Sequence, residues 1–406
     1  MPLFGRRNAS AAPRPATPAE TMRAMRVVRE RAASLFEQKD YRTAISAQLE
    51  AVELAKSIPV GAGTAHDYAS LLGVLMEELC RFQAAAGDRD GARRSCRGAL
   101  RYLKPWAEDA ASPEATIYGA AIMWLTRLLD TPDGREELIG LRAEATRLAT
   151  DRRSSDETMI RQAVALHRIA EALRAEGRVD QEIDVRRDVI SAVDRSRVRN
   201  EDVEIAYADE LARLAVAQAQ AGRFEEAFAV ARRCREFVDE PRTATTPALR
   251  NAVPVAYHGI GYSLREAGRS EQSLDWLTVS DEYLAVLCDE EPSRYLPARA
   301  GVWNDWAYAL QDLGPDRAEE GLAKIDGALD LLGPAAAEES EEVAYVRACA
   351  FDTKADLLGG LGRSAEALPL RRRSAEILRG LPTQSPKKDR YAKDLENVER
   401  RLAADS

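Results

Sequence analysis

The stretch LARLAVAQAQAGRFEEAFAVARRCREFVDEP, residues 211–241, decides the fold. It reads as one helix that runs to Ala221, a break at Gly222, and a second helix. Apolar side chains of the second helix recur at spacings of three and four residues, which places them on one face. That face consists of Phe224, Ala227, Phe228, Ala231, Cys234 and Phe237. The stretch therefore predicts two helices that pack against each other through an apolar stripe.

The break at Gly222 recurs along the chain at intervals of 43 to 48 residues. Equivalent positions hold Lys39, Gly87, Gly134, Gly177, Gly222, Gly268, Gly314 and Gly362. Seven residues before these markers stand Ala32, Cys80, Arg127, Ala170, Ala215, Gly261, Ala307 and Ala355, all small except Arg127. A second column near twelve residues after the markers is Ala51, Ala99, Thr146, Val189, Cys234, Ser280, Ala328 and Ser374. Because helices packed about 8–10 Å apart need small residues at their closest contact, the two columns predict eight helical pairs.

This pattern resembles the tetratricopeptide repeat (TPR) family over nearly the whole chain beyond residue 17. The resemblance is carried by Tyr41, Ala44, Ala51 and Leu54 in the first pair, and by Gly87–Ala92–Ala99, Gly222–Phe224–Ala227 and Gly362–Ala367 later. The period of about 46 residues departs from the usual 34. We expect an all-α fold: a right-handed α-solenoid of about eight TPR-like helix–turn–helix units plus a C-terminal cap helix. This amounts to sixteen or seventeen helices and no sheet.

Three segments are expected along the chain: a flexible tail at 1–16, the repeat array at 17–384, and a capping helix with a tail at 385–406. The array begins at Thr17–Pro18, where Glu20 completes a capping box. The same Ser/Thr–Pro start recurs at 112–113, 131–132, 246–247 and 385–386. Two prolines, Pro254 and Pro297, are expected to kink the helices that contain them. The third unit matches the pattern least and is the expected place for a hinge.

Composition excludes several classes of protein. The net charge of −9 argues against nucleic acid as the main partner. No run approaches eighteen consecutive apolar residues, so we expect no membrane partner or span. The five cysteines are widely spaced and contain no C-x-x-C pair, which predicts neither a disulfide framework nor a zinc site. Without a secretory signal at the N-terminus, these features together favour a cytoplasmic protein.

No catalytic, phosphate-binding or metal-binding motif is present, so we expect no enzyme, no cofactor and no metal. The histidines are His66, His167 and His258. The last two occupy equivalent positions two units apart, which is roughly 20 Å and too far to share an ion. The run Arg371–Arg373 is expected to be a solvent-exposed face, with an acidic partner as the alternative. Cys80 and Cys234 are expected to be core residues.

A candidate binding surface lies on the first helices of units six and seven. His258, Tyr262 and Arg265 stand at i, i+4 and i+7, and Asn304, Tyr308 and Gln311 repeat the pattern 46 residues later. Trp124 and Arg29 hold the position of His258 in earlier units. By register these residues are predicted to face the concave groove, where tyrosine and arginine often dominate binding. The alternative is that both tyrosines pack against neighbouring helices.

The resemblance to TPR proteins implies a protein-interaction scaffold or adaptor that binds a peptide or helix of a partner protein in the concave groove. One alternative is a regulatory sensor whose array changes shape on binding a small peptide or metabolite. Another is an enzyme on a helical-repeat frame, which would require titratable groups that converge in one pocket. The sequence leaves the partner and the oligomeric state open.

Overall fold

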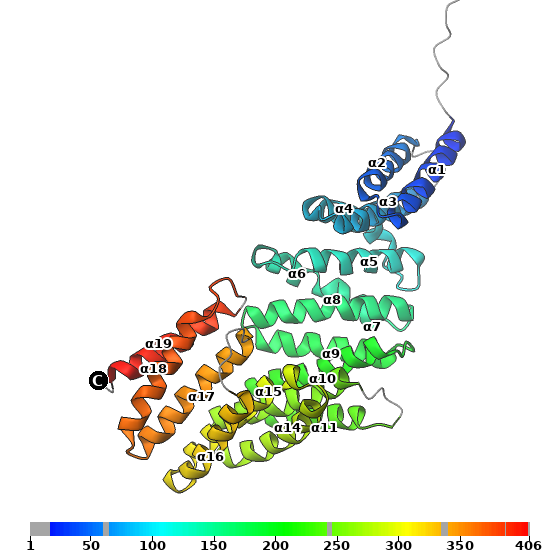
Figure 1. The fold of residues 1–406 in the computed structure, drawn as a ribbon. Helices are drawn as coiled ribbons and strands as arrows, with labels where there is room; N and C mark the ends of the chain where they lie inside the picture. Colours follow the sequence, from blue (N-terminus) through cyan, green and yellow to red (C-terminus); the bar gives the residue numbers. More distant parts are fainter. Residues whose placement is uncertain (1–16, 60–64, 242–245, 334–339, 386, 405–406) are drawn as a thin grey trace, which may run out of the picture. The chain divides into compact units, whose positions relative to one another are not determined.

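The computed structural model describes residues 17–59, 65–241, 246–333, 340–385 and 387–404. All regular structure in these ranges is helical, with nineteen α-helices, two short 3-10 helices and no strand (Figure 1). The prediction of an all-α fold is therefore confirmed. The predicted tail at 1–16 lies outside the described residues.

Contacts divide the chain into two compact units, Met1–Val198 and Arg199–Ser406. The first unit contains four helical pairs. Its helices are α1 (Pro18–Glu37), α2 (Tyr41–Ser57), α3 (Ala65–Ala85), α4 (Arg89–Leu103), α5 (Pro113–Leu128), α6 (Arg135–Gly140), α7 (Arg142–Thr150), α8 (Asp156–Ala175) and α9 (Val179–Arg195). In the first, second and fourth pairs the first helix packs on the second helix of its pair, whereas in the third pair α5 packs mainly on α4 and α8, and α6 and α7 take the place of one second helix.

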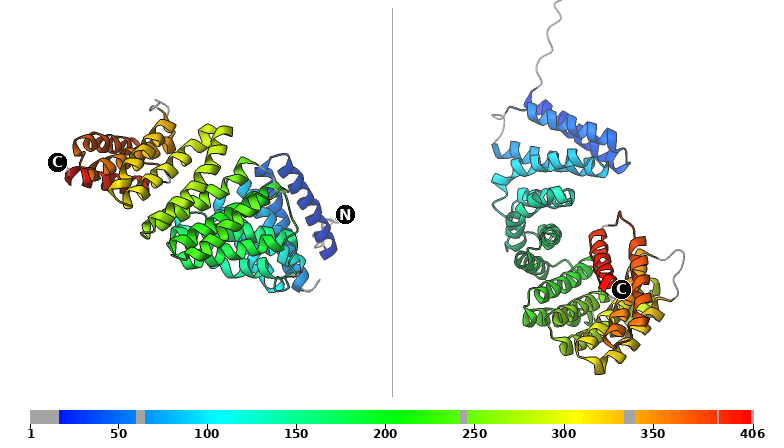
Figure 2. Two further views of the ribbon diagram at one scale, coloured as in Figure 1. Left: turned by 90° about the horizontal axis from the view of Figure 1, so that it is seen from below. Right: turned by 90° about the vertical axis from the view of Figure 1, so that its left-hand side faces the viewer.

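The second unit contains four further pairs and a final helix. Its helices are α10 (Glu201–Gln220), α11 (Phe224–Val238), α12 (Pro247–Arg250), α13 (Ala252–Glu266), α14 (Ser270–Glu290), α15 (Pro292–Asp312), α16 (Pro315–Leu332), α17 (Glu341–Gly360), α18 (Ser364–Gly380) and α19 (Lys388–Ala404). Within this unit the pairs follow one another as successive layers, coloured green to red in Figure 2. The described chain has nineteen helices instead of seventeen because two of the predicted helices are each broken in two, into α6 and α7 and into α12 and α13.

Seven of the eight predicted turn markers have a positive φ angle: Lys39, Gly87, Gly177, Gly222, Gly268, Gly314 and Gly362. A residue in this left-handed conformation commonly ends a helix because it lets following amides turn back to the last carbonyls. At Gly222, for example, the Arg223 amide donates to the Gln218 carbonyl at 2.8 Å. The repeat register deduced from the markers is thus the register of the structure.

The third pair departs from this register, as its sequence indicated. Gly134 has a φ of −94° and lies in a 3-10 helix. A Cβ atom there would lie 2.5 Å from the Leu129 carbonyl oxygen, so a close backbone approach requires the glycine. The small-residue columns shift by one position, because Thr126 and Ala145 are buried while Arg127 is exposed. The break between α6 and α7 accompanies this shift.

The predicted helix caps and proline kinks are found in the structure only in part. Thr17 forms the predicted capping box, and the side chains of Ser112 and Thr246 also cap their helices. Thr131 makes no side-chain cap, and Pro386 lies outside the described residues. The chain breaks between α12 and α13 four residues before Pro254, where the proline ring would clash with the helical carbonyl of Arg250. Pro297 instead lies within an unbroken α15.

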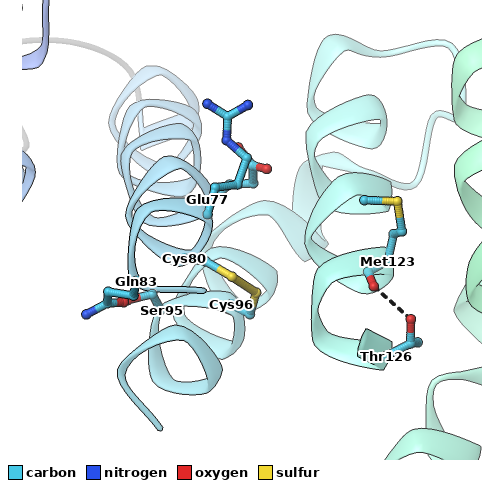
Figure 3. The surroundings of a disulfide bond; sticks show 8 residues. Glu77, Cys80, Gln83, Ser95, Cys96, Met123 and Thr126 are labelled. Atoms are coloured by element: carbon cyan, nitrogen blue, oxygen red, sulfur yellow. Dashed lines mark hydrogen bonds and ion pairs between the residues drawn. A yellow bond between two sulfur atoms is a disulfide. The ribbon is translucent and has the colours of Figure 1, made fainter. Parts of the chain in front are cut away.

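A disulfide bond joins α3 and α4, contrary to the expectation that no cysteines pair. Cys80 and Cys96 are fully buried, and their Cα atoms lie 5.6 Å apart, well within the usual range (Figure 3). Cys80 belongs to the small-residue column, so it stands where the two helices approach most closely. Because the helices are close at this point, Cys96 on the facing helix α4 comes within bonding distance of Cys80. Beside the pair, the Ser95 hydroxyl donates to Gln83 at 2.7 Å.

Candidate functional site

The second unit contains a cavity of about 710 Å³. The first helices of three successive pairs, α13, α15 and α17, line it together with α19 and two residues of α18. On α13 and α15 the lining residues are Tyr262, Arg265, Glu266, Asn304, Asp305 and Tyr308. Four of the six residues predicted on units six and seven therefore line one cavity, and the other two do not.

Arg265 organises the wall formed by α13 and α15. Its guanidinium lies over the ring of Tyr262, 5.4 Å from the centroid, and over the ring of Tyr308 at 4.9 Å. It also forms an ion pair with Glu266. Tyr262 is 43% exposed, which leaves part of its ring open to a ligand.

Tyr308 is held more firmly than Tyr262. Its hydroxyl donates to Asp356 Oδ2 at 3.3 Å, and burial raises the pKa of this hydroxyl above its usual range. The phenol is therefore a neutral donor that joins α15 to α17. The alternative of packing against a neighbouring helix thus describes Tyr308 in part, whereas Tyr262 presents an exposed ring.

Asn304, His258 and Gln311 have different surroundings. The side chain of Asn304 is 8% exposed and forms a hydrogen bond with Thr353 Oγ1 at 2.6 Å. His258 does not line the cavity but contacts a residue that does, with Nε2 at 2.7 Å from Asp305 Oδ2. Gln311 is half-buried and also lies outside the lining.

Trp124 and Arg29 belong to the first unit and do not line this cavity. Arg29 forms an ion pair with Glu78, with Nη2 at 2.6 Å from Oε1. Trp124 is half-buried, and the Arg127 guanidinium lies 5.2 Å from its ring centroid. The structure therefore gives both residues partners within their own unit.

Side-chain hydrogen bonds join each first helix of this site to the next. His258 reaches Asp305, Tyr308 reaches Asp356, and Tyr345 reaches Asp394, at sequence separations of 47, 48 and 49 residues. The last of these bonds joins α17 to α19. In this ladder α19 takes the place that the first helix of a ninth pair would occupy, so the capping helix is also a wall of the site.

Four charged residues next to Tyr308 form a cluster that the sequence reasoning missed. Arg401 Nη2 lies 2.8 Å from Asp352 Oδ2, and Arg371 Nε lies 3.7 Å from Asp352 Oδ1. Asp356 forms ion pairs with both arginines. Arg371 is only 5% exposed, so the prediction that Arg371–Arg373 forms a solvent-exposed face is wrong for its first residue. The signal was present in part, since Asp352 and Asp356 are four residues apart on one helical face.

Among the residues of α17 and α18 that line the cavity, two buried side-chain atoms have no hydrogen-bond partner: Asp352 Oδ1, which lies 3.7 Å from Arg371 Nε, and Ser374 Oγ. Both residues line the cavity, and their exposed fractions are 6% and 0%. Burial raises the pKa of Asp352 to about 6, against the opposing effect of Arg401. At neutral pH this side chain is therefore a carboxylate with one unfilled acceptor.

Two other classes of site were sought in the described part of the chain. It holds no group of three or more His, Cys, Asp and Glu side chains that could bind a metal ion. Within the same residues, no helix combines the length and apolar character needed to span a bilayer.

Comparisons with known proteins return distant likenesses only. No protein-family model matches the sequence, and no curated protein matches it. Among solved structures, Rap protein complexed with competence and sporulation factor has a TM-score of 0.34 and 10% identity, and the alignment covers 95% of this chain and 99% of that one. The S. pombe nuclear import adaptor Nro1 has a TM-score of 0.24 and 15% identity, with coverages of 94% and 99%. Both TM-scores are below 0.5, so we draw nothing about function from either.

Proposed function

We propose that this protein is an interaction scaffold whose second unit binds a peptide segment of a partner protein. The observation that carries the proposal is the cavity of about 710 Å³, lined by α13, α15, α17 and α19 in succession. Its volume lies in the range typical of binding pockets. A solenoid uses its inner helices in this way because residues elsewhere maintain its packing.

The lining favours a peptide over a polyanion such as nucleic acid. Its cations are Arg265, Arg390, Lys393 and Arg401, and its anions are Glu266, Asp305, Asp352 and Asp394. This balance offers no basic excess of the kind that phosphate binding requires. Tyr262, Tyr308 and Tyr345 add aromatic area with polar tips, which suits a peptide that presents both apolar and polar groups.

The acidic groups of the site fit binding better than catalysis. Asp352 and Asp356 form ion pairs with Arg371 and Arg401 on both sides, so their charges are already engaged in the fold. A general acid or base needs to exchange its proton with a substrate within hydrogen-bond reach. The open Tyr262 ring is the more accessible feature, and we propose it as the main anchor.

Site-specific photo-crosslinking in cells tests this proposal. A benzophenone amino acid is placed at Tyr262, and the control places it at Val286, which is 51% exposed on α14 outside the cavity. We expect a defined peptide of one partner to be crosslinked from position 262 and not from 286. With that partner purified, Tyr262→Ala should weaken binding at least about tenfold, as expected for an aromatic anchor. Val286→Ala should leave binding unchanged, and crosslinking from position 286 alone would place the binding surface elsewhere.

A further inference from the structure

The unfilled acceptors of the cavity indicate what kind of group the ligand brings there. Asp352 and Ser374 line the cavity, and their buried atoms Asp352 Oδ1 and Ser374 Oγ have no hydrogen-bond partner in the described part of the chain. Buried polar atoms are nearly always paired, because an unpaired one has lost its hydration without compensation. Asp352 lies on α17 and Ser374 lies on α18, so two helices each provide one acceptor that lacks a hydrogen bond. A ligand with hydrogen-bond donors would pair with both acceptors.

The charges around Asp352 indicate whether that donor is ionised. Two carboxylates, Asp352 and Asp356, face two guanidiniums, Arg371 and Arg401. The full lining is balanced as well, with four acidic and four basic residues. A cationic ligand group would therefore add net charge to a cluster that is already neutral and is buried except at Arg401, and it would also lose its own hydration. An uncharged N–H group fills the acceptor without that cost.

We propose that Asp352 Oδ1 and Ser374 Oγ receive an uncharged amide N–H of the bound peptide, from its main chain or from an Asn or Gln side chain. This inference rests on the proposed function, since it names the ligand chemistry of the same cavity. Arg401 and Arg371 act as positioning residues, because Arg401 holds the other carboxylate oxygen, Oδ2, at 2.8 Å, Arg371 Nε lies 3.7 Å from Oδ1, and both charges favour the ionised form. Tyr262 supplies affinity, and the acceptors fix the register of the peptide.

The test uses the full chain and a positional-scanning library of nonapeptides, acetylated and amidated so that no terminal charge is present. Affinities of the tightest pool are measured for the wild type and for Asp352→Leu, Asp352→Asn and Ser374→Ala. We expect a loss of at least about tenfold for Asp352→Leu, which removes the acceptor. Asp352→Asn should lower the affinity only about threefold, because its amide oxygen still accepts a hydrogen bond. Ser374→Ala should lower the affinity by a similar factor. Asp330→Leu, at an exposed position of α16 outside the cavity, is the matched control and should bind like the wild type.

Two series on the selected peptide separate the sources of the N–H. In one, each main-chain amide is methylated in turn, and in the other, each Asn or Gln is replaced by Ala. One replacement should weaken wild-type binding about tenfold and have little further effect on Asp352→Leu, which identifies the amide that meets this acceptor. Methylation at one position indicates the main chain, and loss on Ala substitution indicates a side chain.

Other outcomes overturn the inference in distinguishable ways. If peptides bind but Asp352→Leu and Ser374→Ala bind like the wild type, the inference fails and the proposed function stands. If the pool requires Lys or Arg and Asp352→Asn loses as much as Asp352→Leu, the ligand group is cationic and the inference also fails. If no pool binds saturably, both proposals fail. Should Asp352→Leu not fold, Ser374→Ala decides, because its hydroxyl has no partner that the fold would lose.

Discussion

Two serines in the same repeat position differ in a way that sequence alone does not show. Ser280 and Ser374 both belong to the small-residue column after the turn, and both are fully buried. Ser280 donates to the Pro254 carbonyl at 3.1 Å, whereas the hydroxyl of Ser374 has no partner. The repeat pattern predicts a small residue at each position because helices touch there. Whether its hydroxyl is used depends on the neighbouring helix, which the pattern does not describe.

Alanine substitutions should separate these two serines. Ser280→Ala should lower the free energy of unfolding by about 1 kcal/mol, because it removes a buried hydrogen bond. Ser374→Ala should leave it unchanged or slightly higher, because it removes a buried hydroxyl without a partner. Urea unfolding of both variants checks this. Equal losses would show that Ser374 has a partner in solution.

Asp352 should make stability depend on pH in the opposite sense to an ordinary paired carboxylate. Its pKa is raised from 3.8 to about 6 in the folded state, mainly by burial. The folded chain therefore binds more protons than the unfolded chain between these values, and this contribution to stability is lost as the pH rises through about 6. Relative to the wild type, Asp352→Asn should gain up to about 3 kcal/mol from pH 4 to pH 7. Asp330→Asn is the control, and parallel curves for both variants would contradict the raised pKa.

At the scale of elements, the turn markers and the two small-residue columns were enough to place seven of the eight helical pairs. They succeed because a left-handed turn and a close helix contact each restrict the amino acid directly. The third pair departs from the pattern by one residue at Arg127, and it is also the pair whose second helix is broken into α6 and α7. The cluster at Arg371 was missed for another reason. A charged residue on a second helix looks exposed until the facing carboxylates are known.

The first turn offers a test of this logic, since Lys39 adopts a φ of 63° where the other left-handed markers are glycines. Lys39→Gly should raise the free energy of unfolding by about 1 kcal/mol, because a side chain disfavours this conformation. Lys56→Gly, at an exposed position near the end of α2, should lower it by about 1 kcal/mol. Thermal unfolding monitored by circular dichroism checks both. A loss at Lys39 would mean that the turn is not left-handed in solution.

At the scale of the whole molecule, the sequence predicted one array, while contacts separate Met1–Val198 from Arg199–Ser406. The turn spacing is equally regular on both sides of this boundary, so the repeat pattern contains no signal for it. Four of the predicted binding residues line one cavity because residues 46 apart fall on neighbouring first helices. Trp124 and Arg29 obey the same register but belong to the other unit. Register predicts the face of a helix, but it does not predict which repeats combine into a site.

The disulfide provides a test of the two units. It joins cysteines that are 16 positions apart in the sequence of the first unit, and reduction should lower the stability of that unit by about 3 kcal/mol. Hydrogen exchange with and without a reductant should show faster exchange in α3 and α4, and unchanged exchange in α13 and α15. The Cys80→Ala, Cys96→Ala variant should be insensitive to the reductant. Equal acceleration in both units would show that they unfold together.

The ladder of bonds from one first helix to the next has a consequence for how such a chain can change in length. Since α19 meets α17 through the same kind of bond that joins α17 to α15, a duplicated hairpin inserted before α19 would find a counterpart for both of its faces. Gene duplication can therefore lengthen the array from within and leave its terminal helix intact. Each added hairpin would also extend the wall of the cavity, so under the proposed function a longer chain would bind a longer peptide.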